Sequence, residues 1–413
     1  MAMNRTQTWV AVIVLGIGAL MALILGHFAY LTFTATPLHP NAQDAPSVIK
    51  AAPSPGWKSS VTNAQRITRD NLSEQNLPGL SVAVGINGDL VWAEGFGWAN
   101  IDSETRVTPA TRFRTGGISI ALTSAAAGLM LEKNQLSLDA EIQTYVPAYP
   151  KKQWPVTLRQ LMGHVGGIVG DRGDEESMEH CDQTADGMQR FANTRLTLEP
   201  GTTFRYTPYG WILVSAAIEA AAHESFFSLM RSRIFEPLAM DATIPDSSSE
   251  PIADLATFYH PRFAGNTRYG PEMSREGDYS CFAGGGGFLS TPSDLVRFAM
   301  AIDGGTLLKP STVTLLQTSQ RLASGQETGY GLGWDLESVA INGEPTRQVG
   351  HDIEFMLGGS ALLATFPERG IVVVVMTNIA FADMQSLAVQ IAQAFAEEAR
   401  RSPVRPTAPH GAT

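Results

Sequence analysis

The chain has 413 residues, of which 44% are hydrophobic, so it can bury a large core in one or two domains. Its 29 basic residues are outnumbered by 40 acidic ones, and the net charge of −11 argues against a nucleic-acid-binding protein, which needs a clustered basic face. Two cysteines are too few for a fold held together by disulfides, although they could form one bridge in an oxidising compartment.

The N-terminal segment is predicted to be a membrane anchor. No Asp, Glu, Lys or Arg occurs over residues 6–41, and the apolar stretch 9–33 is long enough to cross a bilayer core of roughly 30 Å. A cleaved signal peptide has a shorter apolar region, and a buried core helix would need a polar face, so an uncleaved anchor is favoured. Arg5 precedes the span and Lys50 is the first basic residue after it. This bias predicts residues 1–8 in the cytoplasm and the rest in the periplasm, with a single pass through the inner membrane.

The regions that flank the globular part are rich in proline. Residues 34–56 are predicted to be a stiff, extended tether, and residues 401–413 a disordered tail. The globular domain is therefore expected to cover 57–400. Its first strands, 80–86 and 90–97, surround Asn87-Gly88, a strong signal for a type I′ hairpin.

The remaining predicted elements define the fold class. Hydrophobic periodicity predicts helices over 61–74, 118–133, 158–162, 209–222, 295–302 and 383–400, and late strands over 359–365 and 371–378. Thr291 or Ser293 would cap the helix that begins at 295. Because strands lie near both ends of the domain and helices in the middle, we expect an α+β fold: an antiparallel sheet flanked by helices, with an additional all-helical region.

One stretch, residues 112–129, is central to the functional interpretation. Gly116-Gly117 leads into an uncharged run of small and apolar residues, which predicts a helix buried on most faces. The stretch resembles the first motif of the serine β-lactamase and penicillin-binding protein superfamily, in particular its class C-like branch with bacterial and mitochondrial serine β-lactamase-like proteins. Further family-like blocks follow in the family's order, at 156–164, 199–206, 235–240, 283–291, 330–334 and 350–368.

The resemblance implies a definite chemistry. In the family, a serine at the start of the helix attacks a carbonyl to give an acyl-enzyme, which water then hydrolyses. A lysine one turn later, together with a tyrosine from the second motif, handles the serine proton, and two backbone N–H groups form the oxyanion hole. No cofactor is expected for this reaction.

The first and second family motifs lack chemical groups at their first or last positions. Gly117 stands where the serine should be, and Ile120 stands where the lysine should be. The second motif keeps Tyr206, whereas Pro208 replaces a residue that carries an amide in many members. Deliberate inactivation would need only one change, so departures in several motifs favour natural divergence.

The third motif also departs from the family pattern of His-Thr-Gly-Gly. His351 is kept, but Asp352, Ile353 and Glu354 replace small residues beside which substrate would lie. Glu354 would place negative charge near the oxyanion hole and oppose a developing anion. Tyr206 and His351 are interpreted either as remaining ligand-binding groups or as scaffold.

Other serines are poor substitutes for the missing nucleophile. Ser119 lies about 200° around the helix from Gly117, and Ser124 lies two turns deeper in an apolar part. The one Ser-x-x-Lys sequence, 47–50, falls in the predicted tether. His164 belongs to a block that is structural in relatives, so a packing role is favoured.

Metal binding is not expected. Strand alternation is predicted to put Asp352 and Glu354 on the face opposite His351, and the spacing fits no standard ligand motif. The acidic residues that follow Gly170 are interpreted as a solvated loop, with a cation or partner patch as the alternative; they are Asp171, Asp174, Glu175, Glu176 and Glu179. Cys181 and Cys281 lie in segments that border the cleft in relatives and are either a disulfide or buried thiols.

Two functional hypotheses follow. The first is a membrane-anchored periplasmic protein with a catalytically impaired β-lactamase-like site, which binds, scaffolds or regulates through a cell-wall peptide, a β-lactam-like ligand or a protein partner. The alternative is an active hydrolase of peptides or esters with a non-standard nucleophile. Self-association is compatible with the family resemblance, and nucleic acid is not expected as a partner.

Overall fold

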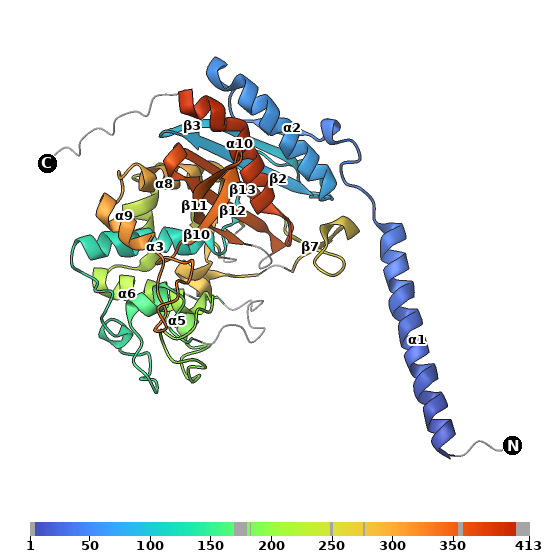
Figure 1. Ribbon diagram of the computed structural model, residues 1–413, viewed down its shortest axis with the longest axis horizontal. Helices are drawn as coiled ribbons and strands as arrows, with labels where there is room; N and C mark the ends of the chain where they lie inside the picture. The colour runs from blue at the N-terminus through green and yellow to red at the C-terminus, as the bar shows by residue number, and fades with distance from the viewer. Residues whose placement is uncertain are drawn as a thin grey trace.

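The chain folds around a large antiparallel sheet with helices on both faces, and one long helix projects from the globular body (Figure 1). The computed structural model describes residues 5–168, 180–181, 183–247, 251–275, 277–353 and 358–401. The acidic loop and Glu354, together with nearly all of the predicted tail, lie outside the described residues.

The large sheet joins strands from both ends of the domain, as the sequence predicts. Its order is β1-β3-β2-β13-β12-β11-β10, with the short β4 paired to β3. The strands are β1 Ser47–Ile49, β2 Gly79–Ile86, β3 Asp89–Asn100, β4 Thr105–Arg106, β10 Asp335–Ile341, β11 Glu344–Ile353, β12 Ser360–Phe366 and β13 Ile371–Thr377. At the β2–β3 turn, Asn87 and Gly88 have φ values of 49° and 92°. A type I′ turn requires positive φ at both positions, so the predicted hairpin is confirmed.

Two small sheets lie beside the large one. The first has the order β5-β9-β6, formed by Phe113–Arg114, Phe288–Ser290 and Ile244–Pro245. The second is the pair β7 Tyr259–Pro261 and β8 Pro271–Met273. The first sheet holds the approach to the family's first motif, because β5 leads directly into the helix that follows Gly117.

Helices cover the two faces of the large sheet differently. Helix α2 (Lys58–Glu74) packs against α10 (Met384–Arg401) over one face, where Trp92 stacks on Phe395 with ring centroids 6.3 Å apart. The other face carries α8 (Pro292–Asp303) and the all-helical region. That region contains α3 Ile118–Glu132, α4 Leu158–Met162, α5 Thr184–Met188, α6 Tyr209–Ala222, α7 Phe226–Met230 with the π-turn Arg231–Phe235, and α9 Pro310–Leu316. The predicted α+β class is therefore confirmed.

The predicted tether is only partly a tether. Residues 47–49 form strand β1 and pair with β3, with Ser47 opposite Phe96 and Ile49 opposite Glu94. Proline is tolerated at a sheet edge because an edge strand leaves one row of backbone groups unpaired. The single Ser-x-x-Lys sequence of the chain therefore begins in an edge strand of the sheet and lies outside the cleft.

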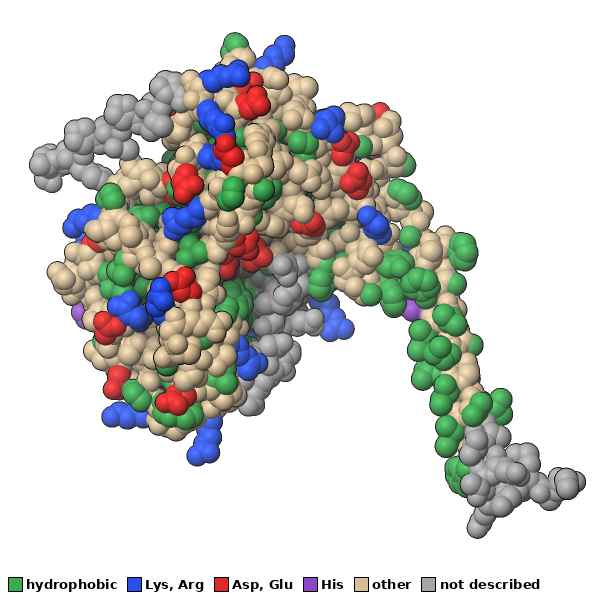
Figure 2. All heavy atoms as spheres, in the orientation of Figure 1, with side chains coloured by type: hydrophobic (Ala, Val, Ile, Leu, Met, Phe, Trp, Pro, Cys, Tyr) green, Lys and Arg blue, Asp and Glu red, His purple; other side chains and the backbone are tan. Residues whose placement is uncertain are grey.

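Helix α1 (Arg5–Thr34) differs from every other helix in its surface. Its segment Val12–Thr34 is long and apolar enough to cross a membrane, and all but its last turns are exposed in the isolated chain. Figure 2 shows hydrophobic side chains along this helix, whereas charged side chains are scattered over the body. Such a surface is expected of a helix whose solvent is lipid.

Candidate functional site

The start of α3 is held in place by backbone and hydroxyl hydrogen bonds. Both the amide and the hydroxyl of Thr115 donate to the carbonyl of Phe288 in β9, at 3.0 and 2.8 Å. Gly116 then adopts φ of 41°, and Gly117 is the residue that caps the helix. Position 117 is therefore fixed at the buried N-terminus of α3, where the resemblance predicts a nucleophile.

The end of strand β11 occupies the space around that position. A Cβ atom on Gly117 would lie 2.5 Å from the carbonyl oxygen of Asp352 and 2.6 Å from Cε1 of His351. A Cβ atom on Gly116 would lie 2.6 Å from Cδ1 of Ile353. These distances are far below van der Waals contact, so a side chain at 117 requires β11 to move. The imidazole of His351 fills the volume that a nucleophile would need.

The neighbouring position is equally unsuited to proton transfer. Ile120 is fully buried in the hydrophobic core of the helical region. An ammonium group buried there would lose its hydration, which is strongly unfavourable. At positions 117 and 120, the surrounding packing therefore disfavours the side chains of the family motif.

A chain of hydrogen bonds fixes the orientation of His351. The amide of Thr207 donates to Nδ1 of His164 at 3.2 Å, and Nε2 of His164 lies 3.1 Å from the hydroxyl of Tyr330. The same hydroxyl lies 3.0 Å from Nε2 of His351. Because Nδ1 of His164 accepts, its Nε2 carries the proton and donates to Tyr330 when the ring is neutral. Tyr330 then donates to His351, whose remaining proton lies on Nδ1.

Burial keeps the members of this chain uncharged. It lowers the pKa of His164 well below its usual value and also lowers the pKa of His351, while it raises the pKa of Tyr330. Nδ1 of His351 lies 3.2 Å from the carbonyl oxygen of Asp352 and 3.7 Å from a carboxylate oxygen of Asp335. Burial, reinforced by repulsion from Glu337, raises the pKa of Asp335 to about 7.

Strand alternation predicts Asp352 on the face opposite His351, but the polar ends of the two side chains lie close together. Ligand atoms of Asp335, His351 and Asp352 all lie within 4.8 Å of one another. The imidazole folds back along the strand toward the carbonyl of its own neighbour, so alternation along the backbone does not separate the two polar ends. These three side chains could meet at one cation, but Nδ1 of His351 carries a proton in the hydrogen-bond chain and would have to lose it.

The second motif keeps a solvent-exposed side chain. Tyr206 is 42% exposed, and its ring centroid lies 5.7 Å from that of His351 and 4.5 Å from that of His164. Pro208 caps α6 and offers no side-chain amide. Tyr206 is therefore an exposed motif side chain among the described residues, and a ligand can reach it.

The hydroxyl groups of the two alternative serines form buried, structural hydrogen bonds. The hydroxyls of Ser119 and Thr115 lie 2.7 Å apart and are buried. The buried hydroxyl of Ser124 donates to the carbonyl of Leu332 at 2.6 Å and accepts from Nε1 of Trp334 at 3.1 Å. Neither hydroxyl faces an accessible cleft.

Comparison with known proteins agrees with this architecture. The family model described as Beta-lactamase matches residues 64–396. The chain belongs to the Beta-lactamase family. Among its relatives, the mitochondrial serine beta-lactamase-like protein LACTB of Mus musculus is 24% identical, over 82% of this chain and 81% of its own length. Penicillin-binding protein 4* of Bacillus subtilis is also 24% identical, over 66% of this chain and 63% of its own length.

Solved structures show the same fold. The octameric penicillin-binding protein homologue from Pyrococcus abyssi superimposes with a TM-score of 0.67 at 22% identity, covering 80% of this chain and 76% of the other. The D-amino acid amidase from Ochrobactrum anthropi gives a TM-score of 0.67 at 21% identity and covers 83% and 99% of the two chains. The β-lactamase-like fold predicted from the motif blocks is confirmed.

A disulfide joins two segments of the helical region. Cys181 and Cys281 are bonded, with Cα atoms 4.9 Å apart. Beside the bridge, Nδ1 of His180 lies 2.9 Å from the buried carboxylate of Asp278. Of the two alternatives, a disulfide or buried thiols, the structure therefore shows the disulfide.

Tyr330 and Asp335 are residues whose roles the sequence did not reveal. Both lie in or next to a family-like block, but neither belongs to one of the three catalytic motifs of the Beta-lactamase family. A hydroxyl-bearing aromatic residue within a glycine-rich block was the available signal, because a buried tyrosine hydroxyl needs partners.

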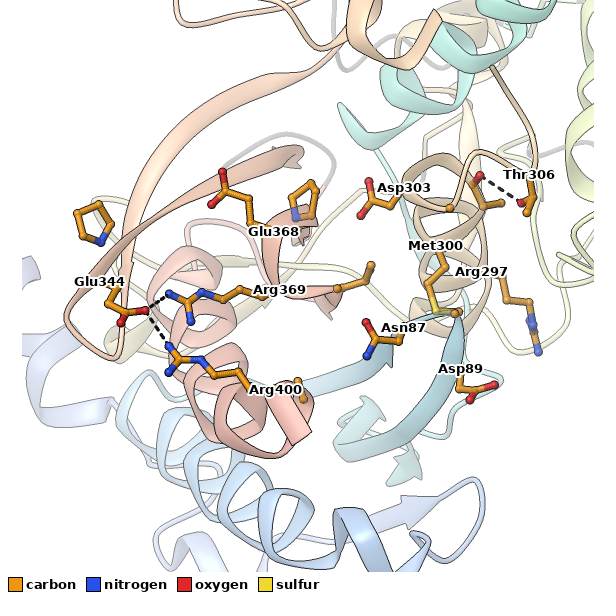
Figure 3. Close-up of a pocket in the computed structure, with 18 residues that line it drawn as sticks. Asn87, Asp89, Arg297, Met300, Asp303, Thr306, Glu344, Glu368, Arg369 and Arg400 are labelled. Atoms are coloured by element: carbon orange, nitrogen blue, oxygen red, sulfur yellow. Dashed lines mark hydrogen bonds and ion pairs between the residues drawn. The ribbon is translucent and has the colours of Figure 1, made fainter. Parts of the chain in front are cut away.

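A cavity of about 940 Å³ lies away from the family motifs, between the β2–β3 turn and the ends of α8 and α10 (Figure 3). Arg369 and Arg400 both point to Glu344 across it, with N–O distances of 2.9 and 2.7 Å. The two guanidinium groups and the single carboxylate leave one positive charge in excess, and none of the lining residues belongs to a catalytic motif. The candidate functional site therefore remains the set of motif positions around Gly117, Tyr206 and His351.

Proposed function

We propose that this protein is a membrane-anchored member of the Beta-lactamase family that has lost acyl-transfer catalysis and acts by binding. The observation that carries the proposal is the position of His351 and Asp352, which leave no room for a Cβ atom on residue 117. A serine there would collide with β11, and a glycine there has no attacking oxygen. Removing such a catalytic unit leaves only the residual rate that binding and backbone dipoles provide.

The binding role rests on the part of the cleft that stays accessible. Tyr206 presents a ring and a hydroxyl at the surface, and aromatic surfaces of this kind provide both apolar area and a polar contact. A cell-wall peptide or a protein partner is the ligand class we propose. Because a structural relative from Pyrococcus abyssi is octameric, self-association is part of the proposal.

The apolar N-terminal helix and the disulfide both support a location for the protein. The apolar helix Val12–Thr34 supports insertion in the inner membrane, and the bonded Cys181 and Cys281 support an oxidising compartment for the domain. Arg5 on the N-terminal side orients the short N-terminus toward the cytoplasm. We therefore propose a single-pass protein with its domain in the periplasm.

Active-site labelling tests the loss of catalysis. The full chain, folded as judged by a cooperative thermal transition, is treated with a labelled penicillin and with a fluorophosphonate, and its intact mass is measured. We expect no adduct. An adduct on any side chain of the cleft would contradict the proposal, and a label that Ser119→Ala abolishes would establish the rival hydrolase.

A rescue variant tests the packing argument separately. Gly117→Ser combined with Ile120→Lys restores the two missing groups, but the new serine meets His351 and the new lysine is buried. We expect no esterase activity above that of Gly117→Ser alone. Robust turnover by the double variant would show that β11 yields easily and that the cleft is not blocked.

A further inference from the structure

Helix α1 meets the globular body at the β7–β8 hairpin, which we define as residues 259–273. The ring of Phe263 lies 5.9 Å from that of Phe28 and 6.4 Å from that of His27, measured between centroids. Tyr269 lies 5.9 Å from Phe28 and 5.5 Å from Phe263, so three aromatic rings form one cluster. The hairpin therefore touches the helix within its membrane-spanning segment and not only at its end.

A second contact lies at the end of the helix. Arg262 donates from Nη2 to the hydroxyl of Thr34 at 3.1 Å and from Nη1 to its carbonyl at 3.4 Å. Leu31, between the two contacts, is only 4% exposed, whereas the span N-terminal to it is exposed. The hairpin thus follows the last two turns of α1, with its arginine toward the helix end and its rings further along the span.

Helix geometry gives the depth of these contacts. The span Val12–Thr34 is about 34 Å long at about 1.5 Å per residue, and Phe28 lies about 9 Å before its end. A hydrocarbon core of about 30 Å centred on this span ends only about 2 Å short of Thr34. Phe28 then lies within the outer leaflet, and the rings that touch it must lie at a similar level.

The opposite arrangement leaves barely enough helix for the bilayer. If the hairpin stood entirely in water, the span would have to end before Phe28. From Trp9 to His27 the helix is about 28 Å long, which falls just short of the core without any tilt. Membrane helices tilt by about 20° on average, which shortens the reach further.

The chemistry of the hairpin suits the membrane boundary. Phe263 and Tyr269 are half-buried and face α1, while Arg268 is exposed and Met273 is 53% exposed. Tyrosine is enriched at the level of the headgroups, and arginine extends its charged end toward phosphate there. Figure 2 shows hydrophobic side chains gathered where α1 joins the body.

We propose that the β7–β8 hairpin inserts into the outer interface of the same bilayer that α1 spans and forms a second membrane contact. This inference rests on the anchor proposed above. Two attachment points resist rotation of the domain about the helix, which a single flexible connection would permit. The hairpin would therefore fix which side of the domain faces the membrane.

Depth-dependent fluorescence tests the inference in the full chain. Ala264→Cys, exposed on the hairpin, and Glu397→Cys, exposed on α10 as the control, are each labelled with an environment-sensitive dye. Cys181 and Cys281 are bonded to each other and do not react. The proteins are reconstituted in phosphatidylcholine–phosphatidylglycerol vesicles, and quenching is measured with nitroxide-bearing lipid and with aqueous iodide.

We expect lipid nitroxide to quench the label at 264 at least threefold more than the label at 397, and iodide to do the reverse. Equal quenching of the two labels would overturn the inference. Flotation of the vesicles after a carbonate wash reports the anchor independently, so protein that fails to float indicates failure of α1 and not of the hairpin.

A second variant separates the hairpin from the helix. Phe263→Ser with Tyr269→Ser removes the two rings, and neither residue belongs to a buried core cluster, so the domain should fold. With the label at 264, we expect lipid quenching to fall at least twofold while the protein still floats. Unchanged quenching would show that the rings do not hold the hairpin in the membrane.

Discussion

The candidate site has two sides that differ: a strand wall formed by the end of β11, and a helical wall formed by α4, α6 and the segment around Cys281. On the strand wall, His351, Asp352 and Ile353 press against Gly116 and Gly117, so the first and third motifs are in contact. On the helical wall, Tyr206 keeps the identity and the exposure of a binding residue. The strand wall therefore packs on the position that lacks the nucleophile, whereas the helical wall retains an exposed side chain.

Tyr330 connects the two walls. Its hydroxyl lies between His164, which follows the helical wall's α4, and His351 on the strand wall. Through these two hydrogen bonds, Tyr330 links the end of β11 to the segment that follows α4. Four predictions test this comparison.

Removal of the disulfide should lower the free energy of unfolding most. It removes a covalent link within the helical wall and leaves the strand wall unchanged. The bridge closes a loop of 100 residues, for which the chain-entropy estimate is about 4–5 kcal/mol. We expect Cys181→Ser with Cys281→Ser to lower the free energy of unfolding by about 4 kcal/mol, measured in urea. A loss below about 1 kcal/mol would mean that the helical wall is held by its core packing and not by the bridge.

Tyr330→Phe should remove the hydrogen bonds that connect the two walls and lower the free energy of unfolding by an intermediate amount. The change leaves the Nε2 proton of His164 and the Nε2 lone pair of His351 without their partner in a buried site. Unpaired buried polar groups cost about 1–3 kcal/mol each, so we expect a loss of about 2–3 kcal/mol in urea unfolding. Tyr149→Phe, at a buried tyrosine outside the chain of hydrogen bonds, is the control and should lose less than half as much.

The same variant has a spectroscopic outcome. In the unaltered protein, ¹⁵N shifts should show His164 protonated at Nε2 and His351 at Nδ1. In Tyr330→Phe the His351 tautomer is no longer imposed and should change or become mixed. An unchanged pure Nδ1 tautomer would show that Asp335 and the Asp352 carbonyl alone determine it.

Gly117→Ala tests the contact at the centre of the proposal. Its methyl group meets Asp352 and His351, and overpacking of this kind costs typically about 1–3 kcal/mol. Gly210→Ala in α6 is the matched control, because its nearest neighbour would be 3.4 Å away and alanine favours a helix. We expect Gly117→Ala to be less stable than Gly210→Ala by about 2 kcal/mol. Equal stabilities would contradict the closed strand wall.

Local signals made the fold and part of the site predictable from the sequence. The Asn87-Gly88 turn and the motif blocks depend on short segments, and the losses at Gly117 and Ile120 are visible as single letters. The inward position of His351 depends on how β11 meets a helix more than 200 residues earlier in the chain. Tyr330 acquires its role only because His164 and His351 meet there, and strand β1 forms only because β3 offers it an edge. Such long-range packing leaves no periodic pattern in the sequence.

The pH dependence of stability should give the smallest effect, and it isolates Asp335, whose carboxylate lies 3.7 Å from Nδ1 of His351. Because its pKa is raised to about 7 in the folded state, that state binds the proton more tightly than the unfolded chain does. The contribution of Asp335 to stability therefore falls as pH rises from about 4 to about 7. The lowered pKa values of His164 and His351 act in the opposite direction, because their stabilising effect is lost as pH falls below about 6.5.

Comparison of the unaltered protein with Asp335→Asn separates these opposing effects. The variant keeps both imidazoles but removes the carboxyl titration, so it should gain stability relative to the unaltered protein between pH 5 and pH 8. The side chain of Asp335 is 38% exposed, and solvent screening limits the expected gain to about 1 kcal/mol or less. Urea unfolding at both pH values measures it. A difference that does not change with pH would mean that Asp335 ionises freely in solvent and that the strand wall is open at that end.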